Sequence, residues 1–294
     1  MILNLFPVPS SLTHQHLFAC LNTLLPTDSK LIRVLDAGCG NGKLISFIFR
    51  ALKSVRPDVS IEIFGFDVVD HGVQMGGFLE KTIMELSSDV HDVPWSERIK
   101  QLHVNEAWDF PDKYFDIVLS NQVLEHVHDK EFFFMESYRV LRDGGYAIFL
   151  APLVHYIYEG HLFLPWVHRI RSHDLLCSYI SFLSLIGLGK YRDHNKNTGI
   201  SRSEFSIKHA DYIHFWTNYI SESKILDITR NINFRASFRY STEFYLLKLR
   251  QLFRLPYRVK YNLHRSAIFD SIAIKFLRYI SSCTLVCEKC NTYK

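Results

Sequence analysis

The sequence predicts an α/β fold: a doubly wound, seven-stranded, mostly parallel sheet with a helical insertion after the fifth strand. Three observations lead to this prediction. Short apolar runs alternate with helical segments along the first half of the chain. A glycine-rich turn follows the first apolar run, as it does where a parallel strand passes directly into a helix. The alternation stops after Pro152 and resumes near Ser221, which marks the insertion.

The apolar runs are nearly continuous, which is typical of strands that are buried on both faces of a parallel sheet. Before the insertion, the sequence predicts a helix over 11–25, strands over 31–38, 61–69, 99–105, 114–120 and 146–152, and helices over 42–55 and 130–142. After it come a helix over 221–232, a strand over 233–240, two helices, and a final strand over 282–289, which we expect to be antiparallel.

Length and composition indicate an ordinary globular protein, because the 294 residues are 48% hydrophobic and 22% charged. The longest apolar stretch, 174–189, is shorter than the roughly 20 residues that a membrane span needs. We therefore expect a buried or interfacial helix there, with peripheral membrane contact left open. The N-terminus has no basic region of the signal-peptide type, and the six cysteines are scattered. Both observations favour a cytoplasmic protein.

Positive charge is concentrated at the C-terminal end of the chain. From Arg230 onward there are 13 Lys and Arg residues against 3 acids, whereas the whole chain has a net charge of only +4. This end of the chain could face phosphate or an anionic surface, or its cations could simply be solvated.

The turn "VLDAGCGNG", residues 34–42, has glycine at three alternate positions. It fails the dinucleotide fingerprint, because Lys43 stands where the third glycine is needed. It also fails the P-loop motif, since Ala37 and Leu44 occupy the positions of the first glycine and the Ser or Thr. The bare backbone must therefore approach a ligand by some other arrangement.

Four segments, taken in order, resemble the class I S-adenosylmethionine-dependent methyltransferases. They are "VLDAGCGNG", "FGFDVV", "FPDKYFDIVLSNQVLEHV" and "YRVLRDGGYAIFLAP". The resemblance covers about residues 30–152 and returns in the closing strands. It implies a Rossmann-like methyltransferase fold, an enzyme, and S-adenosyl-L-methionine as cofactor.

The resemblance also implies a set of cofactor-binding residues. Asp67 would accept hydrogen bonds from the ribose hydroxyls, although an acid at a strand end can also cap a helix. Asp36 could serve only to tie the loop together. The turn after the third strand is one residue shorter than the common pattern. The full set is Asp36, Gly38, Gly40, Gly42, Asp67, Val68, Asn105, Glu106 and Asn121.

Methyl transfer to a hydroxyl benefits from a base beside the acceptor. His126 follows the fourth strand, and His155, Glu159 and His161 open the insertion. His126, His155 and His161 are the candidate catalytic residues, and each could instead be structural. The insertion resembles those of bacterial methyltransferases of cell-envelope polysaccharide pathways, which implies a sugar or glycan as the small-molecule acceptor.

A metal site is not expected. The histidines of the insertion, His168 included, fit no standard zinc spacing. Cys287 and Cys290 form one C-x-x-C without a second pair nearby.

We interpret 1–152 as the cofactor-binding half, 153–219 as an acceptor cap, and 220–294 as the closing part of the same domain. The alternatives are an RNA or lipid acceptor, or a subunit that binds the cofactor without catalysis. Nucleic-acid methylation is disfavoured, because Ser120 to Val123 replace the N/D-P-P-Y/F motif of DNA amino-methylases.

Overall fold

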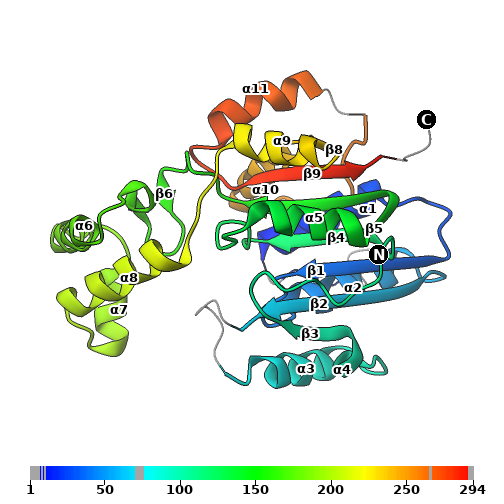
Figure 1. The fold of residues 1–294 in the computed structure, drawn as a ribbon, viewed down its shortest axis with the longest axis horizontal. Helices are drawn as coiled ribbons and strands as arrows, with labels where there is room; N and C mark the ends of the chain where they lie inside the picture. Colours follow the sequence, from blue (N-terminus) through cyan, green and yellow to red (C-terminus); the bar gives the residue numbers. More distant parts are fainter. Residues whose placement is uncertain (1–6, 8, 10, 70–75, 265–266, 291–294) are drawn as a thin grey trace.

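The computed structural model describes residues 7, 9, 11–69, 76–264 and 267–290, and its centre is one seven-stranded sheet (Figure 1). The strands lie in the order β3-β2-β1-β4-β5-β9-β8. Their bounds are β1 Leu31–Ala37, β2 Ser60–Val68, β3 Ile99–Leu102, β4 Phe115–Asn121, β5 Leu141–Ala151, β8 Phe234–Ser237 and β9 Cys283–Lys289. Neighbouring strands from β3 to β5 pair in parallel, and β9 is antiparallel to β5 and to β8. The predicted fold class and the antiparallel final strand are confirmed.

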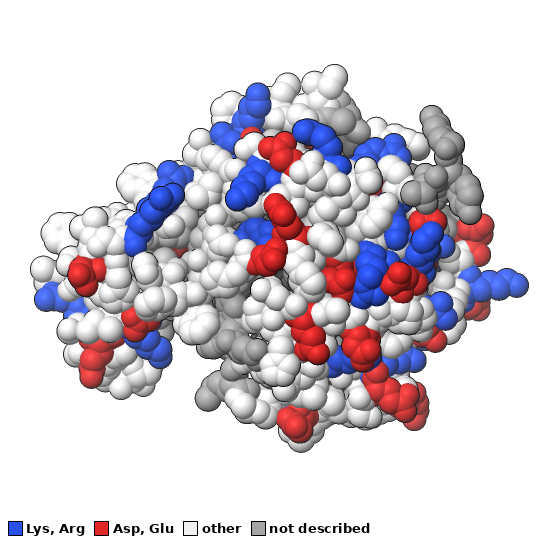
Figure 2. Space-filling view, in the orientation of Figure 1, with Lys and Arg blue, Asp and Glu red and all other residues white. Residues whose placement is uncertain are grey.

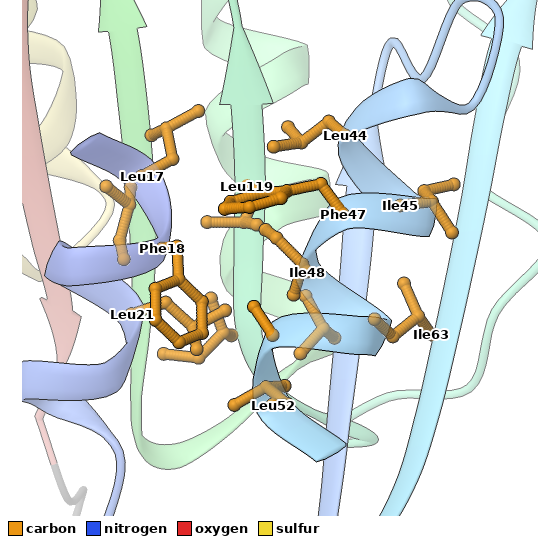
Figure 3. Close-up of a cluster of buried hydrophobic side chains, with 14 of the residues drawn as sticks. Leu17, Phe18, Leu21, Leu44, Ile45, Phe47, Ile48, Leu52, Ile63 and Leu119 are labelled. Atoms are coloured by element: carbon orange, nitrogen blue, oxygen red, sulfur yellow. The ribbon is translucent and has the colours of Figure 1, made fainter. Parts of the chain in front are cut away.

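Helices cover both faces of the sheet, as a doubly wound fold requires. One face carries α1 (Leu12–Leu24), α2 (Lys43–Val55) and α10 (Ser241–Leu252), and the other carries α5 (Lys130–Val140), α9 (Glu222–Asn231) and α11 (Ala267–Leu277). Figure 3 shows how α1 and α2 meet above the strands: Phe18 and Phe47 pack edge to face, 5.9 Å between ring centres. Burial of such side chains is the main source of stability for this layer.

Two helices between the second and third strands were not predicted. They are α3 (Phe78–Asp89) and α4 (Trp95–Arg98). Helix α3 buries only Phe78, Thr82 and Leu86. One of these three residues is polar, so the apolar periodicity on which the prediction depended is weak.

The fifth strand begins earlier than predicted, because it continues through the "DGG" turn. The pairing with β4 skips from Leu141 to Tyr146, so residues 142–145 form an irregularity inside the strand. Gly144 has a φ of 74°, and a Cβ on Gly145 would lie 2.9 Å from the Asp116 carbonyl oxygen. The glycines thus permit a bulge where a turn was expected. The third strand is shorter than predicted and ends at Leu102.

The insertion forms a small layer with its own core, beside the carboxyl ends of the parallel strands (Figure 1). It contains the two-residue hairpin β6 (Tyr158–Glu159) and β7 (Leu164–Pro165), the 3-10 helix η1 (Val167–Arg169), and helices α6 (His173–Leu185), α7 (Tyr191–Thr198) and α8 (Arg202–Trp216). It is mostly helical, as predicted, and the hairpin is the one departure. Across the described residues, no helix has the length and apolar character that crossing a bilayer requires.

Candidate active site

A cavity of about 330 Å³ lies at the carboxyl ends of β1, β2, β3 and β4, where parallel α/β sheets bind ligands. The insertion contributes to its wall through His161 and Tyr212. Of the residues predicted for the site, those that line the cavity are Gly38, Gly40, Asp67, Val68, Asn105, Glu106, Asn121, His126 and His161.

The glycine loop is locked against β2 by backbone hydrogen bonds. The N–H groups of Gly38 and Cys39 donate to the Phe66 carbonyl oxygen, each at 2.9 Å. Gly38 has a φ of 87°, and a Cβ there would collide with the Val123 side chain. Only glycine fits this position, so bare backbone faces the cavity.

Asp67, near the carboxyl end of β2, holds the glycine loop through its side-chain carboxylate. Its Oδ2 accepts a hydrogen bond from the Gly40 N–H at 2.7 Å, and its Oδ1 accepts one from the Val68 N–H at 2.8 Å. A buried, oriented carboxylate at the edge of the cavity fits a ligand that offers two hydroxyl donors.

Two residues of the predicted set support the loop without lining the cavity. Asp36 is buried beneath it, and burial, followed by the charge of Asp67, raises the pKa of Asp36 well above its usual value. Gly42 begins α2 with a φ of 72°, and a Cβ there would lie 2.8 Å from the Leu86 side chain. We therefore propose a structural role for both residues.

The turn after β3 forms another wall of the cavity. Asn105 has a φ of 60°, and the Glu106 carboxylate accepts a hydrogen bond from the His103 N–H at 2.7 Å. Trp108, which the sequence analysis did not single out, also lines the cavity, 4.6 Å between ring centres from Phe66. The aromatic surface suits a flat ring such as adenine.

Asn121 ends β4 at the centre of the cavity wall. Its side-chain Nδ2 donates to Thr13 Oγ1 at 3.3 Å. Its Oδ1 is buried and has no hydrogen-bond partner among the described residues. An unsatisfied buried acceptor is costly, so this oxygen fits a donor on a bound ligand.

Two of the three candidate catalytic histidines meet at one tyrosine. Tyr212 Oη lies 3.1 Å from His161 Nε2 and 3.4 Å from His126 Nε2. His126 Nδ1 is 2.7 Å from the Trp216 carbonyl oxygen, so this nitrogen carries the proton and donates it. Nε2 of His126 is then a proton acceptor on the cavity side. Tyr212 is a site residue that sequence reasoning missed.

Glu159 holds the second histidine in place. This carboxylate is fully buried and accepts hydrogen bonds from the backbone N–H groups of His161 and Leu162, from His161 Nδ1 at 2.6 Å, and from Tyr219 Oη. Both oxygens of Glu159 are occupied, so this carboxylate fixes the His161 ring and is poorly placed to accept a proton itself.

The same contact changes the proton affinity of His161. Burial alone would lower the pKa of His161, but the hydrogen bond to Glu159 and the charges of Glu159 and Glu125 outweigh it and raise the pKa above the usual value. Burial raises the pKa of Glu125 to about 7. A cluster of perturbed acids and bases beside a cavity is typical of an active site.

The comparison with known proteins agrees with this geometry. A family model described as "Methyltransferase domain" matches residues 12–193, more than half of the chain. The chain belongs to the S-adenosylmethionine-dependent methyltransferases. This chain is 26% identical over 222 residues to the ubiquinone biosynthesis O-methyltransferase of Pelagibacter ubique (strain HTCC1062), a match that covers 73% of this chain and 75% of that one.

Two solved structures are similar to this methyltransferase. The S-adenosylmethionine-dependent methyltransferase from Mesorhizobium loti has a TM-score of 0.50 and 13% identity, with 95% of this chain and 100% of that one covered. Phosphoethanolamine N-methyltransferase 2 of Haemonchus contortus, in complex with S-adenosyl-L-methionine, has a TM-score of 0.49 and 14% identity, with 98% and 55% covered. The Mesorhizobium loti structure supports the fold.

The third candidate histidine lies outside the cavity of this methyltransferase. His155 packs against the Tyr279 ring, 5.7 Å between centres, and burial lowers its pKa. His168 Nε2 is 3.1 Å from the Val154 carbonyl oxygen, and its ring packs against that of Tyr219 at a tilt of 40°. Within the described residues, no group of His, Cys, Asp and Glu side chains is arranged to hold a metal ion.

We expect the purified methyltransferase to bind S-adenosylmethionine and its demethylated product, but not NAD or ATP. The loop lacks the glycine and hydroxyl positions that hold a pyrophosphate, and Lys43 and Leu44 stand there instead. Titration calorimetry with each of the four ligands tests this expectation. NAD binding as tight as that of S-adenosylmethionine would contradict it.

Proposed function

We propose that this methyltransferase methylates a hydroxyl oxygen of a small molecule, most favourably a sugar or glycan of cell-surface polysaccharide biosynthesis. One observation carries the proposal: the Nε2 atoms of His126 and His161 converge on Tyr212 Oη at the wall that the insertion adds to the cofactor cavity. Nitrogen lone pairs at this position suit the removal of a proton from an acceptor hydroxyl.

S-adenosylmethionine supplies a methyl group on a positively charged sulfur. The residues of this chain have to aim the acceptor oxygen along the line of that bond and exclude water. As the O–CH₃ bond forms and the S–CH₃ bond breaks, the hydroxyl proton passes to Nε2 of His161. Tyr212 stays protonated, since burial and the nearby carboxylates raise its pKa. When the acceptor binds, the one O–H of Tyr212 turns from His161 Nε2 to the acceptor oxygen, which leaves Nε2 open to take the hydroxyl proton.

His161 is the better base of the two histidines. Its ring is oriented by a buried carboxylate, which also stabilises the imidazolium that forms when the proton arrives. His126 is oriented only by a neutral carbonyl oxygen. We therefore assign proton acceptance to His161 and acceptor positioning to His126.

The acceptor would enter from the insertion side. A shallow depression of about 720 Å³ shares His161 and Tyr212 with the cofactor cavity. It combines a Trp216 ring with the polar side chains of Lys208 and Asp211. Aromatic faces can pack on the C–H groups of a sugar while polar groups bond its hydroxyls, so this lining supports a glycan acceptor. The name of the Pelagibacter ubique relative supports oxygen as the methylated atom.

Methyl transfer from radiolabelled S-adenosylmethionine into a cell extract tests the acceptor class. The extract is then fractionated into glycan, lipid, nucleic acid and protein. We expect the label in the glycan or small-sugar fraction, as an ether that resists mild base. Label in RNA or lipid would show that the acceptor belongs to that class instead. No incorporation, by a protein that still binds the cofactor, would favour a non-catalytic subunit.

The pH profile tests the role of Glu159. Because a base acts only when it is deprotonated, we expect kcat/KM to rise with pH through an apparent pKa above the usual value of histidine. Glu159→Gln removes the charge that raises this pKa, so the rise should move to lower pH. Glu62→Gln serves as control: Glu62 is half-buried, pairs with Arg33 and does not line the cavity, so the profile should stay unchanged. An unshifted profile in Glu159→Gln would exclude His161 as the titrating base.

A further inference from the structure

The segment after α10 and the outer face of α11 form an exposed surface that the methyl-transfer site does not use. We call it the basic–apolar surface, and it consists of Leu252, Phe253, Arg254, Leu255, Tyr257, Arg258, Val259, Lys260, Leu263, Ile268, Ile272, Lys275 and Phe276. Figure 2 shows the upper rim, over α11, as mostly white, with blue and red groups below it. From 252 to 260 every residue is exposed, and the large apolar side chains are interspersed with cations along the chain.

The exposure of these apolar side chains is high. Leu252 is 73% exposed, Ile268 75% and Phe276 71%. On α11, residues 268, 272 and 276 are four apart and form one stripe, whereas Ile274 and Leu277 are buried against the body. Grouped exposed apolar side chains of this kind mark an interaction site.

The backbone beneath the surface is fixed to α1. The Asn22 side-chain amide donates to the Val259 carbonyl oxygen at 2.9 Å, and the Tyr261 N–H donates to Thr23 Oγ1 at 2.7 Å. Gln15 donates in the same way to the Arg258 carbonyl oxygen. The Tyr261 side chain is buried as an anchor. These hydrogen bonds fix the backbone of this segment while the side chains of 258–260 are exposed to solvent. The fold therefore holds these side chains at the surface.

Among the described residues, three of its cations have no acidic partner. In the part of the chain that the structure describes, no carboxylate lies within ion-pair distance of Arg254, Lys260 or Lys275. Arg258 reaches a carboxylate, that of Glu243, at 3.2 Å. Four of the 13 Lys and Arg residues from Arg230 onward thus lie on this surface.

We propose that the basic–apolar surface docks this methyltransferase onto an anionic lipid bilayer. Apolar side chains would enter the boundary between headgroups and acyl chains, and the neighbouring cations would contact lipid phosphates. A second copy of the chain fits less well, because a symmetric dimer would bring the unpaired cations of both copies together. RNA also fits less well, since solvent-exposed Ile and Leu side chains gain nothing from a phosphate backbone. This inference is independent of the acceptor proposed above.

The outer face of α6 offers a matched comparison. Leu175 is 59% exposed and Phe182 58%, within the stretch that the sequence analysis left open for membrane contact. Its neighbour Asp174 is fully exposed and anionic. Helix α6 contains no Lys or Arg, so it has the apolar character without cations of its own.

Vesicle co-sedimentation tests the proposal with the full chain. The vesicles contain phosphatidylcholine alone or phosphatidylcholine mixed with phosphatidylglycerol. We expect binding to the anionic vesicles, weaker binding at high salt, and little binding to the neutral ones. No binding to anionic vesicles, or equal binding to both, would overturn the proposal.

Paired substitutions locate the surface. Arg254→Glu with Lys260→Glu should weaken binding about tenfold or more, since each cation near an anionic membrane contributes roughly fivefold. Phe253→Ser with Phe276→Ser should weaken it similarly, and all four positions are exposed, so folding should be kept. The control pair, Leu175→Ser with Phe182→Ser on α6, should bind like the parent protein.

Loss of vesicle binding in the control pair alone, or in none of the pairs, would contradict the assignment. A dimer that the phenylalanine pair dissolves would show a second copy as the occupant.

Discussion

His161→Ala is expected to lower kcat by about a hundredfold or more, with little change in the dissociation constant of S-adenosylmethionine. The substitution removes the nitrogen that accepts the hydroxyl proton, and it leaves the glycine loop and Asp67 untouched. The measurement is turnover at saturating cofactor, combined with titration calorimetry for binding. His155→Ala is the matched control: it belongs to the same insertion, lies outside the cavity, and should keep near-normal turnover.

The same series distinguishes the two histidines of the cavity. His126→Ala should lower turnover less than His161→Ala, because His126 positions the acceptor in the proposed mechanism. If the His161 variant keeps full turnover and the His126 variant loses it, the base is His126, after the fourth strand. The insertion then only lines the cavity. If all three variants keep full turnover, the histidine mechanism is wrong.

Asp67→Ala is expected to weaken binding of S-adenosylmethionine about tenfold or more. Hydrogen bonds to a charged group contribute about 1.5–3 kcal/mol each, and two ribose hydroxyls would be affected. Calorimetry provides the dissociation constant, and thermal unfolding provides the control for stability, since Asp67 also accepts the Gly40 N–H.

Asp67→Asn separates the two roles of this side chain. Asn keeps an acceptor for the Gly40 N–H but loses the negative charge, so it should restore the unfolding temperature while binding stays weakened. An unchanged dissociation constant in both variants would mean that Asp67 serves only to hold the loop.

Much of the fold could be predicted because its signals are local. The continuous apolar runs of the parallel strands and the glycines after β1 depend on neighbours in sequence, and the structure confirms both. Helix α3 was missed because only three of its residues are buried, and one of them is Thr82. The "DGG" turn was misplaced because a bulge inside a strand and a turn before it need the same residues.

The candidate site was less predictable, because it depends on contacts between distant segments. His126, His161 and Tyr212 come from three segments, and only folding brings their polar atoms together. The histidine-rich string of the insertion pointed to His155 as strongly as to His161. No feature of the neighbouring sequence indicated that Glu159 would orient His161 and not His155. A tyrosine inside an aromatic stretch gave no signal of its own.

A crystal structure of the protein with S-adenosylhomocysteine tests the central claim most directly, because it fixes the atom from which the methyl group leaves. The account predicts the ribose hydroxyls at Asp67, the adenine beside Asn105 and Trp108, and the sulfur facing His161 and Tyr212. A sulfur that faces away from these two side chains, or that another segment shields from them, would contradict the claim that the insertion completes the methyl-transfer site.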